Sequence, residues 1–427
     1  MKARLNSGLP TTRACYDDPP ESASSVENGP EVMTEVGVAN RGLRTTPRGG
    51  RWREKPRLAL TVPFLSLVFP LLLRISAAQA NPVSFSDLAS RAAAARDAND
   101  AAGAIELYQQ ALELNSRWSD GWWFLGSLQY GSSAYAAARD ALSHYLELTS
   151  NAAPALAMRG LCEFEIAEYE KSLNDIQRAL ALGAANQPRN EKILRYHQAL
   201  LLTRTGRFED ALRNYAFFTH DNDSNPELLL ALGLAGLRTP LLPKELKSDQ
   251  QELYISAGKA AFDFMKGDKE TARSEFLHLF QRVPAVPNAH YLYGYLLYAS
   301  DPDAALAEFK NELQAAPNAV AEVMLAWIPL LQNDGAAALP YARKAVAEDP
   351  ALPSAQLVLG RALTETGDTK DGIEHLEKTL QLQPDNLEVH LALAKAYSKS
   401  GRKEDARRER LQCLEMTKNE TAPATHP

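Results

Sequence analysis

The chain has 427 residues, of which 45% are hydrophobic and 23% charged, so most of it should fold around one long core or several cores. The formal net charge is −7, and residues 81–427 alone carry −11. An acidic body is a poor match for phosphate-rich partners, so we expect no nucleic-acid binding. The three cysteines, Cys15, Cys162 and Cys413, are far apart, which excludes a disulfide framework and a CxxC pair.

The chain begins with a leader, residues 1–57, that is rich in Pro, Gly, Ser and Arg and has no apolar periodicity. Such a composition cannot bury enough apolar surface to fold, so we expect this leader to be disordered. Its last residues are basic, and Met33 is an alternative start of translation.

A secretory signal peptide is predicted next, in residues 58–80. The apolar segment Leu58–Leu73 follows the basic residues, and Ala78 and Ala80 supply the small side chains of a cleavage site. Cleavage there leaves Asn81 as the first residue of a periplasmic or secreted protein.

A competing interpretation keeps Leu58–Leu73 as a membrane anchor, and membrane contact is expected only in that case. This segment is shorter than the ~20 residues that span a bilayer, and Pro63 and Pro70 interrupt it. Arg74, however, is unusual before a cleavage site, so both interpretations stay open.

From Phe85 onward, small residues recur with a period close to 34. A first series has gaps of 34, 34, 39, 34, 27, 34, 32, 34 and 34, and a second series lies about twelve residues later in nearly every unit. The first series is Ala92, Gly126, Gly160, Ala199, Gly233, Ala260, Gly294, Ala326, Gly360 and Ala394; the second is Ala104, Ala138, Ser172, Ala211, Ala272, Ala305, Ala338, Gly372 and Ala406.

With the motifs WWFLGSLQY, LVLGRALTETGD and ALELNSRW, these residues make the chain resemble the tetratricopeptide-repeat family over residues 85–416. The resemblance implies an all-α, right-handed superhelical solenoid of about nine to ten helical hairpins. Small residues then let the helices approach closely, and stacking of hairpins buries one continuous core.

The repeat pattern breaks once. Pro226–Arg238 reads as a first helix without its partner, and residues 239–250 contain two prolines that stop a helix. We expect either a hinge between two sub-arrays, 81–238 and 251–416, or a degenerate repeat packed as rigidly as its neighbours. Residues 417–427 are expected to be a disordered tail.

No catalytic, nucleotide-binding or metal-ligand motif is present in the sequence. The eight histidines show no ligand spacing, and no nucleophile with a neighbouring base is evident. We therefore expect no enzyme activity, no metal, no cofactor and no small-molecule substrate.

The resemblance places first-helix positions two, five, nine and twelve along an inner groove, and aromatic residues recur there. Such rings offer large contact area to a protein or peptide partner, although each ring could instead pack against a neighbouring helix. We expect a scaffold that binds proteins in a bacterial cell envelope; an accessory subunit that binds extracellular polysaccharide is the alternative. The candidate groove residues are Trp123, Tyr130, Phe164, Tyr196, Phe264, Tyr291, Tyr295, Tyr298 and Trp327.

Overall fold

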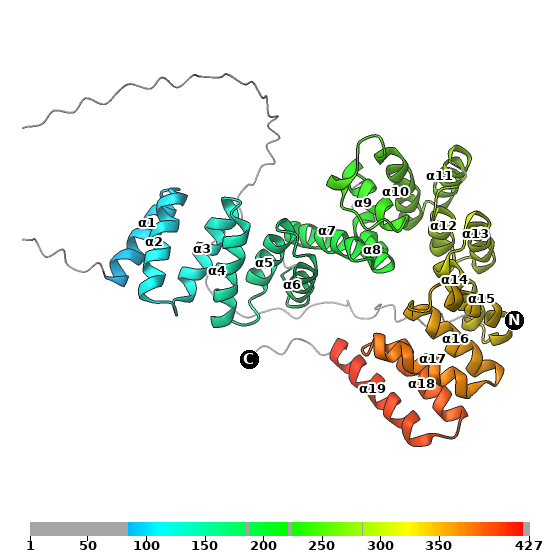
Figure 1. The fold of residues 1–427 in the computed structure, drawn as a ribbon. Helices are drawn as coiled ribbons and strands as arrows, with labels where there is room; N and C mark the ends of the chain where they lie inside the picture. The colour runs from blue at the N-terminus through cyan, green and yellow to red at the C-terminus, as the bar shows by residue number, and fades with distance from the viewer. Residues whose placement is uncertain (1–83, 185–187, 221–223, 284, 422–427) are drawn as a thin grey trace, which may run out of the picture. The chain divides into compact units, whose positions relative to one another are not determined.

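The structure of the chain is a computed structural model that describes residues 84–184, 188–220, 224–283 and 285–421 (Figure 1). Within these ranges the chain forms nineteen α-helices and two short 3₁₀ helices, and no strand. The fold is an all-α solenoid, as the sequence predicts. The predicted leader, signal peptide and cleavage site lie outside the described residues.

The helices follow one another at short intervals along the chain (Figure 1). Before the break these are α1 (Phe85–Asp97), α2 (Ala101–Leu114), α3 (Ser119–Gly131), α4 (Tyr135–Leu148), α5 (Ala153–Glu165), α6 (Tyr169–Ala181), α7 (Pro188–Arg204), α8 (Phe208–Tyr215) and η1 (Ala216–Thr219). The break comprises α9 (Pro226–Gly236) and η2 (Pro243–Glu245), and α10 (Gln251–Lys266) begins directly after the connector. After it come α11 (Lys269–Arg282), α12 (Ala289–Leu297), α13 (Pro302–Ala315), α14 (Ala319–Leu331), α15 (Gly335–Glu348), α16 (Pro353–Thr366), α17 (Thr369–Leu382), α18 (Leu387–Lys399) and α19 (Lys403–Thr421).

Local sequence explains where many of these helices begin. The side chain of Asp100 accepts a hydrogen bond from the backbone N of Gly103, 2.9 Å away, and Asp334 caps α15 in the same way. These caps satisfy backbone N–H groups that have no partner inside the helix. Proline lies in the first turn of α5, α9, α13 and α16, where its missing N–H costs nothing.

Tight turns join the two helices of a hairpin, and most contain one residue in the left-handed region. Asn99 (φ 59°), Ala167 (φ 63°) and Gly367 (φ 106°) occupy equivalent places in their turns. Only Gly adopts this conformation without steric cost, yet asparagine and even alanine are held there by the flanking helices.

The small residues of both series are buried between paired helices. A side chain on Gly126 would place its Cβ 2.8 Å from Cγ of Leu142, and one on Gly360 would meet Cγ of Leu376 at 2.7 Å. The helices of a hairpin thus cross with one backbone almost touching side chains of the other. The buried residues at these positions are Gly126, Gly160, Ala199, Gly294, Gly360 and Ala394 in first helices, and Ala138, Ala211, Ala272, Ala338 and Ala406 in second helices.

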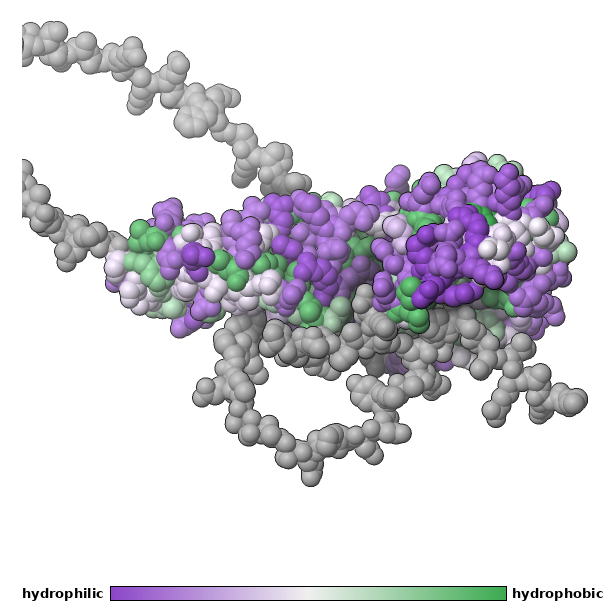
Figure 2. Space-filling model, turned by 90° about the horizontal axis from the view of Figure 1, so that it is seen from below, coloured by the Kyte–Doolittle hydropathy of each residue, from purple (hydrophilic) through white to green (hydrophobic). Residues whose placement is uncertain are grey.

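The core extends through the stacked hairpins. Its largest cluster runs from Leu156 on α5 to Tyr293 on α12 and therefore crosses the break without interruption. On the face drawn in Figure 2, hydrophilic residues cover most of the surface and apolar patches lie between them. This distribution is what stacked amphipathic helices produce.

The helix expected to lack a partner has one, because α9 packs against α10 across the connector. Gly233 and Gly258 make this possible: a Cβ on Gly233 would lie 1.8 Å from the carbonyl O of Tyr254, and one on Gly258 would lie 1.9 Å from that of Leu229. The two backbones therefore touch directly. All residues of α9 from Leu228 to Gly236 are buried.

The connector, residues 239–250, is held by specific contacts. Leu242 and Leu246 are buried, and Nη1 of Arg204 donates a hydrogen bond to the carbonyl O of Pro240 over 2.6 Å. The backbone N of Leu242 also donates to Oε2 of Glu245, at 2.7 Å. These contacts tie the connector to α7 and close its short 3₁₀ turn, while the hinge stays a prediction.

The C-terminal helix is longer than expected. Helix α19 continues to Thr421, five residues into the stretch predicted to be a disordered tail, because no Gly or Pro interrupts the chain before Pro423. No helix in the described part of the chain is long and apolar enough to cross a membrane.

The contact between α9 and α10 can be tested with Gly233→Ala. Alanine raises helix propensity by up to ~1 kcal/mol, but its Cβ meets the Tyr254 carbonyl and should force the helices apart, which we expect to cost about 3 kcal/mol. Hydrogen exchange should accelerate in α9 and α10. Gly131→Ala is the control, since nothing lies within 4 Å of its added Cβ; equal protection in both variants would contradict the close packing.

Candidate functional site

After the break, the side chain at position nine of the first helix changes in character from one repeat to the next. Tyr295 on α12, Trp327 on α14, Arg361 on α16 and Lys395 on α18 follow one another at intervals of 32, 34 and 34 residues. Helix α16 contacts both α14 and α18. The side chains change from aromatic to cationic along these helices.

The two aromatic residues of this series, Tyr295 and Trp327, form a surface together with Tyr298, the residue that follows α12. All three rings are half-buried and pack against one core cluster, which includes Phe309 and Leu325. The ring centroids of Tyr295 and Tyr298 are 5.5 Å apart. Burial raises the pKa of Tyr295 to about 12, although nearby Arg213 opposes this rise. We call these three residues the aromatic surface.

Tyr291, predicted to belong with them, is buried instead, with 3% of the residue exposed. Its hydroxyl donates a hydrogen bond to Oε1 of Glu209 on α8, 2.8 Å away. Arg238, at the end of α9, pairs with Glu209 and lies 5.2 Å from the centre of the Tyr291 ring. Residues from before the connector therefore cover this ring, and it has no area left for a partner.

The other predicted rings are distributed along earlier hairpins. Phe164 on α5 is also buried, with 6% exposed, and packs edge-on against His197. The ring centroids of Trp123 and Tyr145 are 5.5 Å apart. The remaining rings are half-buried on α3, α7 and α10; they are Tyr130, Tyr196 and Phe264. The candidates fall mainly into two core clusters. Tyr291, Tyr295, Tyr298 and Trp327 belong to or pack against one cluster, and Tyr130, Phe164, Tyr196, Phe264 and again Tyr295 belong to or pack against the other.

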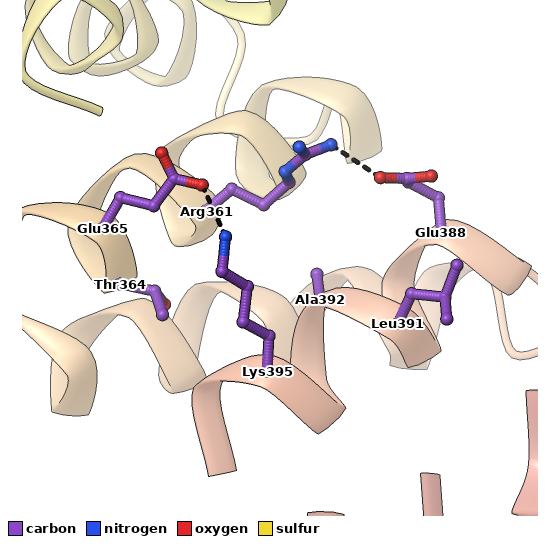
Figure 3. Close-up of a pocket in the computed structure, with 7 residues that line it drawn as sticks. All are labelled: Arg361, Thr364, Glu365, Glu388, Leu391, Ala392 and Lys395. Atoms are coloured by element: carbon purple, nitrogen blue, oxygen red, sulfur yellow. Dashed lines mark hydrogen bonds and ion pairs between the residues drawn. The ribbon is translucent and has the colours of Figure 1, made fainter. Parts of the chain in front are cut away.

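A pocket of about 170 Å³ lies between α16 and α18, next to the aromatic surface (Figure 3). Nη1 of Arg361 donates to Oε1 of Glu388 over 2.6 Å, and Nζ of Lys395 donates to Oε1 of Glu365 over 2.9 Å. The guanidinium of Arg361 also lies 4.7 Å from the centre of the Trp327 ring. We call it the charged pocket; it is lined by Arg361, Thr364, Glu365, Glu388, Leu391, Ala392 and Lys395.

This pocket was not predicted from the sequence, because the residues expected at the groove positions after the break were aromatic rings. The signal was present: Arg361 and Lys395 occupy position nine, as Trp327 does, and Glu388 occupies position two of its unit. The position of Glu365 across from Lys395 is visible only in the structure.

Comparisons with known proteins agree with this fold. Two family models, both described as tetratricopeptide repeat, match residues 364–410 and residues 90–153 and 196–261. Over these matched residues the chain consists of tetratricopeptide repeats. No curated protein matches it.

Solved structures with similar folds include MamA, from residue 41 to its end, of Desulfovibrio magneticus RS-1: identity is 21%, 40% of this chain and 98% of that chain are covered, and the TM-score is 0.36. YrrB, described as a TPR protein with an unusual peptide-binding site, has 16% identity, coverage of 38% and 84%, and a TM-score of 0.33. Yeast Tom70 has 12% identity, with 78% of this chain and 84% of that chain covered, and a TM-score of 0.32. Similarity at this level says nothing about the partners of this chain.

Tyr291, on α12, and Tyr298, the residue that follows α12, should respond differently to truncation. Tyr291→Ala removes a buried ring. Glu209 then loses its hydrogen bond from the tyrosine hydroxyl and Arg238 loses its contact with the ring, so we expect the free energy of unfolding to fall by about 3–5 kcal/mol. Tyr298→Ala removes a half-buried ring and should cost less than half as much. Hydrogen exchange in α12 and α13 measures both, because a repeat array opens locally; equal losses would contradict the assignment.

Proposed function

We propose that this chain is a non-catalytic scaffold whose aromatic surface binds peptide segments of partner proteins through apolar anchors. The observation that carries the proposal is the cluster of Tyr295, Tyr298 and Trp327, which keep part of their ring area exposed while their other faces are fixed in the core. Rigid, partly exposed Tyr and Trp rings are the side chains most often found at interaction hot spots.

Electrostatics around the rings support a peptide partner. Arg361 lies over the Trp327 ring and Arg213 lies near Tyr295 and Tyr298, so both ends of the aromatic surface carry a cation. Cations beside exposed rings suit a segment with apolar side chains and backbone carbonyl groups. The polysaccharide alternative needs hydrogen-bonding carboxylates or amides beside the rings. The carboxylate of Glu209, near Tyr295, is already paired with Arg238 and Tyr291.

The proposal is tested by selecting peptides from a random display library on the full chain and measuring their affinity for variants. Trp327→Ala and Tyr298→Ala should each weaken binding by ~2 kcal/mol or more, a loss of about thirtyfold. Tyr135→Ala is the matched control, because this half-buried ring lies at the start of the second helix α4.

Equal affinities for all three variants would overturn the proposal for this surface. A glycan array probed with the same preparation tests the alternative: binding there that depends on Trp327, with no peptide selected, would favour polysaccharide.

We also propose that the scaffold acts in a bacterial cell envelope after export. The support is the order of segments in the sequence: basic residues, the apolar segment Leu58–Leu73, then Ala78 and Ala80. These residues lie outside the described part of the chain, so the proposal depends on sequence alone.

N-terminal sequencing of the protein after expression from its full reading frame tests export. We expect the mature chain to begin at Asn81 and to be recovered without membranes. A product that retains Leu58–Leu73 and sediments with membranes would replace this proposal with an anchored protein.

A further inference from the structure

The charged pocket presents three accessible side chains on one face of α18. Glu388, Leu391 and Lys395 lie at i, i+3 and i+7, which places them on one side of a helix. Their exposure is substantial: 40% of the Glu388 side chain, 48% of Leu391 and 48% of the Lys395 side chain. An acid, an apolar group and a base thus follow one another along this wall.

The opposite wall holds the two charges in place. Arg361 and Glu365 on α16 are mostly buried, with 16% and 8% of their side chains exposed, and each pairs with the opposite charge on α18 (Figure 3). The second oxygen of Glu365 has no hydrogen-bond partner among the described residues, so Lys395 is the cation that balances it. The buried residues therefore fix the orientation of the accessible ones.

Ion pairs such as these generally add little to the stability of a fold. Charges that are removed from water cost free energy that their mutual attraction only partly recovers, and apolar side chains in the same places commonly serve the fold as well or better. Each accessible partner also keeps unused capacity: an ammonium has three donors and a carboxylate about four acceptor positions, and contacts with the described residues use one donor of Lys395 and one oxygen of Glu388.

From these observations we infer that the charged pocket is a peptide subsite that recognises one basic and one acidic side chain at positions i and i+3 of a partner segment. Seven helical residues place Glu388 and Lys395 ~10 Å apart along α18. A peptide in the polyproline II conformation repeats every three residues and ~9 Å, so its side chains i and i+3 project on the same side with matching separation. The basic side chain meets Glu388, the acidic one meets Lys395, and the aliphatic part of the basic side chain contacts Leu391.

This inference rests on the proposed function, since it assigns a second part of the same partner. The Arg361 guanidinium joins the two sites, because it forms the wall of the charged pocket and covers one face of Trp327. A partner segment that leaves the aromatic surface would therefore enter the charged pocket next.

The test uses fluorescent, end-blocked peptides of sequence Pro-Lys-Pro-Pro-Glu-Pro and of the reversed order, titrated into the full chain by fluorescence anisotropy. Comparison peptides replace the lysine, the glutamate or both with glutamine, and one places the two charges side by side. We expect each lost charge to weaken binding about three- to fivefold, and the adjacent arrangement to bind like a singly charged peptide.

Protein variants locate the effect. Leu391→Ala keeps both ion pairs and the helix, so it should fold normally and still weaken binding. Glu388→Gln should abolish the preference for lysine over glutamine and keep that for glutamate. Glu374→Gln, the same change on an exposed residue of α17, is the matched control, and thermal unfolding of each variant verifies folding.

Equal affinity for charged and uncharged peptides, or indifference to the spacing of the charges, would overturn the inference. Its failure is distinguishable from failure of the proposed function. One outcome would contradict the subsite and leave the proposed function intact. In it, the selected peptides need Trp327 and Tyr298, but the Glu388→Gln and Leu391→Ala variants bind both these peptides and the charged test peptides with unchanged affinity. The opposite outcome would contradict the proposed role of the aromatic surface instead. In it, affinity depends on the spacing of the two peptide charges, while Trp327→Ala leaves the binding of the selected peptides unchanged.

Discussion

Close approach of helices at small residues is the constraint on which the rest of this structure depends. A hairpin of two amphipathic helices cannot cover its own apolar face, so it must stack on a neighbour. For hairpins to stack with constant geometry, the distance between the two helices must be similar in every hairpin. Gly126 against Leu142 and Gly360 against Leu376 show this contact at the two ends of the array, 234 residues apart. A larger residue at either glycine would change the separation of its helices and the direction of the hairpins that follow.

The break shows the same constraint in a different form. Where the regular second helix is absent, α9 and α10 approach even more closely, backbone to backbone, through Gly233 and Gly258. The core therefore continues through the break, and the connector is anchored to it by Leu242 and Leu246. One consequence is functional: α8 and the end of α9 reach α12, so that Glu209 and Arg238 close over Tyr291.

After the break, aromatic and charged side chains share position nine of successive first helices. Aromatic rings at Tyr295 and Trp327 give way to cations at Arg361 and Lys395, and carboxylates from the facing helices pair with those cations. Arg361 belongs to both parts. Under the proposed function, a scaffold with this surface would discriminate among partners by the order of apolar and charged side chains along a segment, because one contact type alone would accept many sequences.

The sequence alone determined the fold class, the hairpin spacing and the buried small positions, since these depend on contacts between residues within about one repeat, such as Gly360 with Leu376. Helix starts were local as well, because a capping Asp or Asn acts within three residues. Only the tertiary structure decided that α9 pairs with α10, that Tyr291 is covered by Glu209 from 82 residues away, and that Glu365 faces Lys395. Those contacts depend on the path of the chain through several hairpins, and periodicity within one repeat carries no information about that path.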